Sequence, residues 1–81
     1  MNVALYRRYL QQYVREAIAN SDGTNAGIAE YLSVLNISGF LVKHRVEKQR
    51  ALADAQQAFN EHRHWPLKIV LSHLGVEEDR R

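Results

Sequence analysis

The sequence of 81 residues predicts an all-α fold, a small bundle of three to four helices that forms a single domain over residues 1–81. Apolar side chains recur at intervals of three and four residues, which is the helical period, and period-two alternation fails. Only one segment collects several turn-forming residues, Ser21 to Gly27, and the only proline is Pro66. These observations predict helical segments with few breaks between them.

The first predicted helix runs from about Val3 to Asn20. Its apolar side chains follow the spacing i, i+3, i+4, i+7 of one helical stripe, and the polar residues between them face water. Residues 20–23 favour turns and left-handed backbone, so they end the helix. The stripe comprises Tyr6, Tyr9, Leu10, Tyr13, Val14, Ala17 and Ile18.

The second predicted helix is short and covers about Asn25 to Leu35. Thr24 or Asn25 caps it, because either side chain can accept a backbone N–H bond that a helix start leaves open. Gly27 lies inside this helix, where glycine costs about 1 kcal/mol relative to alanine.

The third predicted helix is one long rod over about residues 37–64, with Asn36 or Ser38 as its N-cap. A helix of that length measures roughly 40 Å at 1.5 Å per residue. It is longer than so short a chain needs, which leaves part of its flank uncovered. Its small residues Ala51 and Ala55 let another helix approach closely.

A short fourth helix follows Pro66, which suits the first helical position because its missing N–H would be unpaired there. Leu67, Val70, Leu71 and Leu74 share one face, and Gly75 is the expected C-terminal cap. We expect the first and fourth helices to pack against two sides of the long third helix.

Composition and charge exclude several classes of protein. The absence of cysteine rules out a disulfide framework, a thiolate metal site and a thiol nucleophile. The net charge of +2 is a small excess for a protein that binds nucleic acid mainly through phosphate. The longest uncharged run, residues 31–42, falls short of the about 20 residues of a membrane span. Because Arg7 and Arg8 also interrupt any export signal, we expect a cytoplasmic protein without contact with the membrane.

No residue pattern indicates catalysis, so we expect neither an enzyme nor a cofactor. The serines lie in no nucleophile-elbow context, and no phosphate-binding glycine loop occurs. His62 and His64 are two residues apart, which directs them about 200° apart on a helix, so they do not form the i, i+4 pair of a metal site. We therefore expect no metal, and we interpret His44 as a partly buried, hydrogen-bonded side chain.

Three tyrosines on one stripe indicate either the edge of the core or a surface that binds a partner. Tyrosine tolerates a partly solvent-exposed position because one end of its side chain is apolar and the other forms hydrogen bonds. Tyrosine and arginine are both enriched at protein interfaces, and arginines border this stripe. The sequence alone leaves both interpretations open.

Our first hypothesis is a non-catalytic protein-protein interaction module that is homodimeric and acts as an adaptor or an inhibitor of another protein. By analogy, small bacterial or phage accessory proteins often bind host factors in this way. The residues predicted to bind the partner are Tyr6, Arg7, Arg8, Tyr9, Tyr13, Arg45, Lys48, Ala51 and Ala55.

The alternative hypothesis is a DNA-binding regulator that uses residues 28–50. The segment Ile28 to Val34 resembles the first helix and turn of bacterial helix-turn-helix regulators, with a small residue inside and a leucine three residues further on. The resemblance implies that the next helix carries side chains for phosphates or base edges. The residues predicted to bind nucleic acid are Lys43, His44, Arg45, Lys48 and Arg50.

Overall fold

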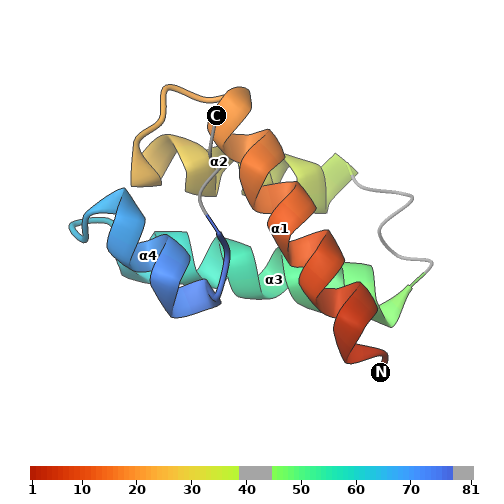
Figure 1. Ribbon diagram of the computed structural model, residues 1–81. Helices are drawn as coiled ribbons and strands as arrows, with labels where there is room; N and C mark the ends of the chain where they lie inside the picture. Colours follow the sequence, from red (N-terminus) through yellow and green to blue (C-terminus); the bar gives the residue numbers. More distant parts are fainter. Residues whose placement is uncertain (39–44, 78–81) are drawn as a thin grey trace.

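The structure, a computed structural model, describes residues 1–38 and 45–77. This part of the chain contains four helices and no strand, which confirms the predicted all-α bundle. α3 packs mainly against α1, which crosses it, and against α2, while α4 makes a smaller contact with it (Figure 1). The helices are α1 (Val3–Ala19), α2 (Asn25–Ser38), α3 (Val46–Glu61) and α4 (Leu67–Leu74).

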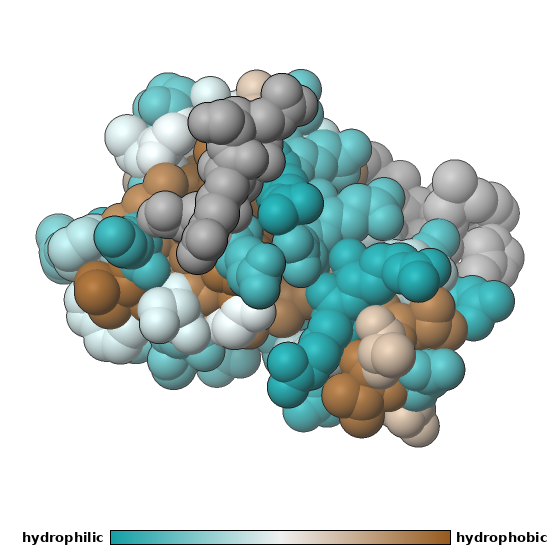
Figure 2. Space-filling view, viewed as in Figure 1, coloured by the Kyte–Doolittle hydropathy of each residue, from teal (hydrophilic) through white to brown (hydrophobic). Residues whose placement is uncertain are grey.

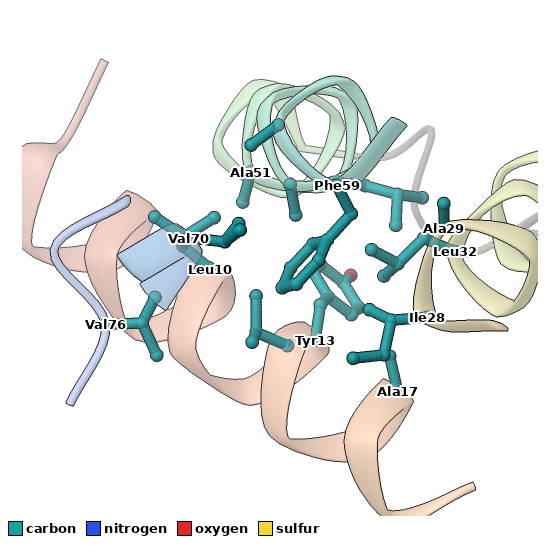
Figure 3. Packing of buried hydrophobic residues seen from close by; sticks show 14 of the residues in the cluster. Leu10, Tyr13, Ala17, Ile28, Ala29, Leu32, Ala51, Phe59, Val70 and Val76 are labelled. Carbon is teal, nitrogen blue, oxygen red and sulfur yellow. The ribbon is translucent and has the colours of Figure 1, made fainter. Parts of the chain in front are cut away.

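The hydrophobic core lies where the apolar faces of these helices meet (Figure 3). Phe59 of α3 is fully buried, and its ring lies among Tyr13 of α1 and Ile28 and Leu32 of α2. Removing an apolar side chain of this size from water contributes about 1.5–3 kcal/mol. The faces that the helical period predicts are therefore the faces that hold the helices together.

The prediction of one long helix over residues 37–64 is wrong. α2 continues to Ser38, so Asn36 lies inside α2 and caps no later helix. Arg45 has extended backbone, with φ −137° and ψ 133°, and α3 begins after it at Val46. Residues 39–44 lie outside the described part of the chain. The predicted second helix therefore extends beyond Leu35 to Ser38, and the predicted long third helix is the shorter α3, which packs against α2.

Asn2 caps α1 and joins its N-terminal end to that of α3. Its side-chain oxygen accepts from the Leu5 N–H at 3.1 Å and caps α1. Its own N–H donates to Glu47 Oε2 at 2.9 Å. This bond holds the pKa of the Glu47 carboxyl below its ordinary value. The two helices therefore begin at the same end of the molecule.

Asn25 joins the start of α2 to the corner between α3 and α4. The residue is buried, and its side-chain amide donates to the carbonyl oxygens of His62 at 3.1 Å and Trp65 at 2.6 Å. Carbonyl groups at the end of a helix have no partner within the helix. The His62 carbonyl also accepts from the Trp65 N–H at 3.1 Å, so the Asn25 amide is its second donor, and the same amide supplies a donor to the Trp65 carbonyl. The corner is thus fixed by a residue 37 positions earlier in the chain.

The predicted limits of α4 agree closely with the structure. Pro66, predicted as the first helical residue, is the N-cap, so α4 begins one residue later at Leu67, and Gly75 ends the helix with a left-handed φ of 74°. The Gly75 N–H donates to the Ser72 carbonyl and the Val76 N–H to the Leu71 carbonyl, which is a Schellman motif. α1 and α4 both contact α3, as expected, but α2 makes a larger contact with α3 than α4 does.

Candidate partner-binding surface

The predicted tyrosine stripe crosses α3, and its first member forms hydrogen bonds within the chain. The Tyr6 hydroxyl donates to Asp54 Oδ2 at 2.6 Å. Asp54 also lies 3.5 Å from Arg50 Nε, one turn earlier on α3. Burial, followed by the hydrogen bond to Asp54 and its negative charge, raises the pKa of the Tyr6 phenol to about 12. Tyr6 is thus a half-buried residue at the edge of the α1–α3 contact.

The next two tyrosines divide between the edge and the core. Tyr13 is only 8% exposed and belongs to the core, and burial raises the pKa of its phenol. Tyr9 is half-buried and stacks on Tyr13 with ring centroids 6.5 Å apart. Lys48 Nζ lies 5.2 Å from the centre of the Tyr9 ring, within the range of a cation–π contact. The stripe therefore belongs to the edge of the core, and only its outer margin reaches the surface.

Two residues predicted to contact a partner are used inside the monomer. Ala51 and Ala55 of α3 are fully buried in the core cluster. Their small side chains allow a neighbouring helix of the same chain to approach closely. The sequence analysis predicted such a close approach but assigned it to a partner molecule. These two residues and the buried Tyr13 therefore cannot contact another molecule while the fold is intact.

Exposed arginines remain on α1 as candidates for binding a partner. Arg7, Arg8 and Arg15 are exposed. Arg8 and Arg15 line a shallow groove of about 380 Å³ together with two glutamines of the same helix, Gln11 and Gln12. The salt bridge between Arg50 and Asp54 is the only one among the described residues, so none of these arginines has such a partner there. A second molecule that presents carboxylates would complement this face.

The structure does not contain the turn that the helix-turn-helix resemblance implies. Residues 28–38 belong to one continuous helix, so no turn separates Val34 from the residues after it. Lys43 and His44 lie outside the described residues. Arg45 is exposed, whereas Lys48 lies against Tyr9 and Arg50 against Asp54. The described cations of this segment are therefore partly engaged in contacts within the chain.

The outer face of α2 is the candidate that the sequence analysis missed. Of the 14 residues of α2, only Glu30 is charged. Ile28 and Leu32 face the core, yet Val34 is 57% exposed and Ile37 is 81% exposed. A low content of charge along a whole helix is the signal that would have identified this face, because a helix at the surface normally has a polar side.

Histidines and an aromatic ring form a separate cluster at the α3–α4 corner. His62 stacks on Trp65 with ring centroids 3.7 Å apart, and His73 meets both rings edge-on. A groove of about 310 Å³ lies beside them, and its polar groups bond to one another, Tyr6 to Asp54 and Gln57 to Glu61. In residues 1–38 and 45–77, no three His, Cys, Asp or Glu side chains gather closely enough to hold a metal ion.

Hydrophobic side chains also reach the surface elsewhere on the described helices. Figure 2 shows hydrophobic atoms at the N-terminal end of α1, where Met1 and Val3 are exposed. A groove of about 330 Å³ runs between α1 and α4, with Ile18, Leu67 and Leu71 among its lining residues. No helix within the described ranges has the length and apolar character needed to cross a membrane.

Comparison of the chain with protein-family models, with curated proteins and with solved structures finds no match. The residues described above are the basis of the functional proposal that follows.

Proposed function

We propose that this chain is a non-catalytic protein-protein interaction module of the cytoplasm that is homodimeric and binds another protein as an adaptor or an inhibitor. The observation that carries the proposal is the outer face of α2, a helix of 14 residues with a single charge that exposes Val34 and Ile37. Large apolar side chains exposed one turn apart on a helix favour a binding surface. The long third helix predicted over residues 37–64 is not formed, so its uncovered flank does not support the proposal.

The arginines of α1 supply the second element of the proposal. Arg8 and Arg15 flank the glutamines of one groove and have no ion-pair partner among the described residues. Arginine binds carboxylates through two parallel hydrogen bonds, which gives orientation as well as affinity. We therefore assign this face to an acidic surface of the partner protein.

Affinity capture with charge-reversal variants tests this assignment. The immobilised chain is incubated with native lysate of the source organism, with and without nuclease, and the bound material is identified by mass spectrometry. The double variant Arg8→Glu/Arg15→Glu is compared with Lys68→Glu, which reverses an exposed charge on α4. We expect one nuclease-resistant protein to bind the parent chain and Lys68→Glu and to be lost with the α1 variant.

Two results would contradict the proposal. Equal capture by both variants would remove the α1 face as the binding surface. Bound material that disappears with nuclease would favour the DNA-binding alternative, which further requires duplex affinity that falls steeply with salt and with Arg45→Glu. Circular dichroism of each variant checks that the helices remain folded.

A further inference from the structure

Four residues follow the outward side of α2 at helical spacing. They are Ala26, Glu30, Ser33 and Ile37, and the intervals of four, three and four residues keep them on one stripe. Ala26, Glu30 and Ile37 are exposed, and Ser33 is half-buried. The stripe has its smallest side chain at one end and its largest at the other, with a hydrogen-bond acceptor and a hydroxyl donor between them.

This order makes the stripe complementary to a reversed copy of itself. When a second copy lies antiparallel, Ala26 faces Ile37 of the partner subunit, and Glu30 faces Ser33 of the partner subunit. The same contacts recur on the other side of a two-fold axis, as in any isologous interface. We propose that the homodimer forms through this antiparallel pairing of α2 with α2 of a second copy. The inference rests on the proposed function and names the surface through which the homodimer assembles.

The sides of the stripe support the same arrangement. Val34 lies on one flank, and the two-fold axis brings the Val34 side chains of both copies to the same flank of the helix pair. On the other flank a groove of about 450 Å³ runs between α2 and α3, lined in part by Ala29, Ser33 and Arg63. The small side chains allow a second helix to approach, and Arg63 supplies positive charge in the groove that Glu30 also lines.

The size of this surface sets the expected affinity. Ile37 lies eleven positions after Ala26, which is about 16 Å along a helix at 1.5 Å per residue. One helix pair of this length buries less than the about 1,600 Å² of a standard stable complex. The dimer is therefore expected to dissociate in the micromolar range, and its fraction depends on concentration.

Sedimentation equilibrium over a range of concentrations measures the association. The 9.4 kDa chain is expected to approach twice that mass as its concentration rises. Ile37→Lys is expected to lower the association constant about a hundredfold, because two symmetry-related apolar contacts are lost at once. Ile69→Lys is the matched control, since Ile69 is 49% exposed on α4 and lies outside the stripe. It should associate as the parent chain does.

Cysteine pairing tests the direction of the helices on a background free of cysteine. A mixture of Ala26→Cys and Ile37→Cys chains is expected to form a disulfide between the two chains under mild oxidation. Ala26→Cys alone should not, because the two positions lie about 16 Å apart along an antiparallel pair and a disulfide requires a Cα separation below about 7 Å. Lys68→Cys serves as a control for random collision.

Each outcome separates this inference from the proposed function. A dimer that persists in Ile37→Lys, or a disulfide in Ala26→Cys alone, overturns the α2 pairing and leaves the homodimer standing. A parent chain that stays at 9.4 kDa at millimolar concentration overturns both the pairing and the homodimer. Capture of a nuclease-resistant partner through α1 would then still test the remaining part of the proposed function.

Discussion

Gly27 shows how one contact reverses the effect expected of a residue. In a helix interior, alanine is favoured over glycine by about 1 kcal/mol. A Cβ at position 27 would collide with Asp22 Oδ1 and lie 3.1 Å from Thr24 Oγ1. Asp22 is held there because it accepts from the Thr24 N–H at 3.0 Å and from the Thr24 hydroxyl at 2.7 Å. Glycine at this position therefore leaves room for the Asp22 carboxylate and its two hydrogen bonds to Thr24.

Gly27→Ala is expected to lower the free energy of unfolding by about 1 kcal/mol, because displacing Asp22 loses two hydrogen bonds of about 0.5–1.5 kcal/mol each and outweighs the gain in helix propensity. Urea unfolding followed by circular dichroism measures the change. In an Asp22→Ala background the same substitution should cost less or stabilise the protein, because the colliding oxygen is gone. A single Gly27→Ala variant more stable than the parent chain would contradict this account.

Tyr6 makes stability depend on pH in the alkaline range. Its phenol ionises near 10.0 in the unfolded chain and near 12 in the folded chain. The folded state therefore holds this proton more tightly, and the contribution of Tyr6 to stability is complete below pH 10 and is lost as pH rises toward 12. Tyr6→Phe should flatten the fall of the unfolding free energy over this interval without abolishing it, since burial also raises the pKa of Tyr13. Urea unfolding at a series of pH values measures the slope, and an unchanged slope would exclude Tyr6 as its source.

At the scale of elements, a single side chain decides how α4 is attached. Asn25→Ala removes the donor to the carbonyl oxygens of His62 and Trp65 at the α3–α4 corner. The His62 oxygen keeps the Trp65 N–H as a donor, whereas the Trp65 oxygen loses its 2.6 Å hydrogen bond. We expect a loss of about 2 kcal/mol in the free energy of unfolding. Because Trp65 is the only tryptophan, its fluorescence in the folded state should also change.

Asn36→Ala is the control for this measurement, since Asn36 is exposed on the same helix and its side chain forms, among the described residues, only a 3.5 Å contact with Gln56. It should shift stability by less than about 0.5 kcal/mol. Equal losses in the two variants would show that helix propensity, rather than the corner, sets the cost.

Helix limits were predicted well where the signal is local. Pro66 and Gly75 limit α4, and Asn20 follows α1, because the conformational preferences of proline, glycine and asparagine act within one turn. The boundary between α2 and α3 was predicted too early, at about Asn36, although a glycine follows Ser38 in the sequence. The strong helix formers further along favoured one continuous helix from residue 37, whereas Ile37 and Ser38 belong to α2 and Arg45 has extended backbone before α3.

At the scale of the whole molecule, several residues that the sequence analysis assigned to partner binding have a different role in the structure. Tyr13, Ala51 and Ala55 were assigned to a partner and instead form the core. A small or aromatic residue on a stripe suits a contact within the chain as well as one with another chain, so sequence spacing cannot distinguish the two. The exposed Ile37 was missed because it was predicted at the start of the long third helix, whereas it lies near the end of α2.

The helical period, the caps and the composition were enough to determine an all-α bundle without cysteine, since each depends on residues near one another in the chain. Which apolar faces meet, and which one stays exposed, depends on contacts such as Asn25 with Trp65 that link distant residues. Burial is a property of the assembled molecule, because a side chain loses its water only when another helix arrives. The exposed face of α2, on which the proposed homodimer depends, was therefore decided by the tertiary structure alone.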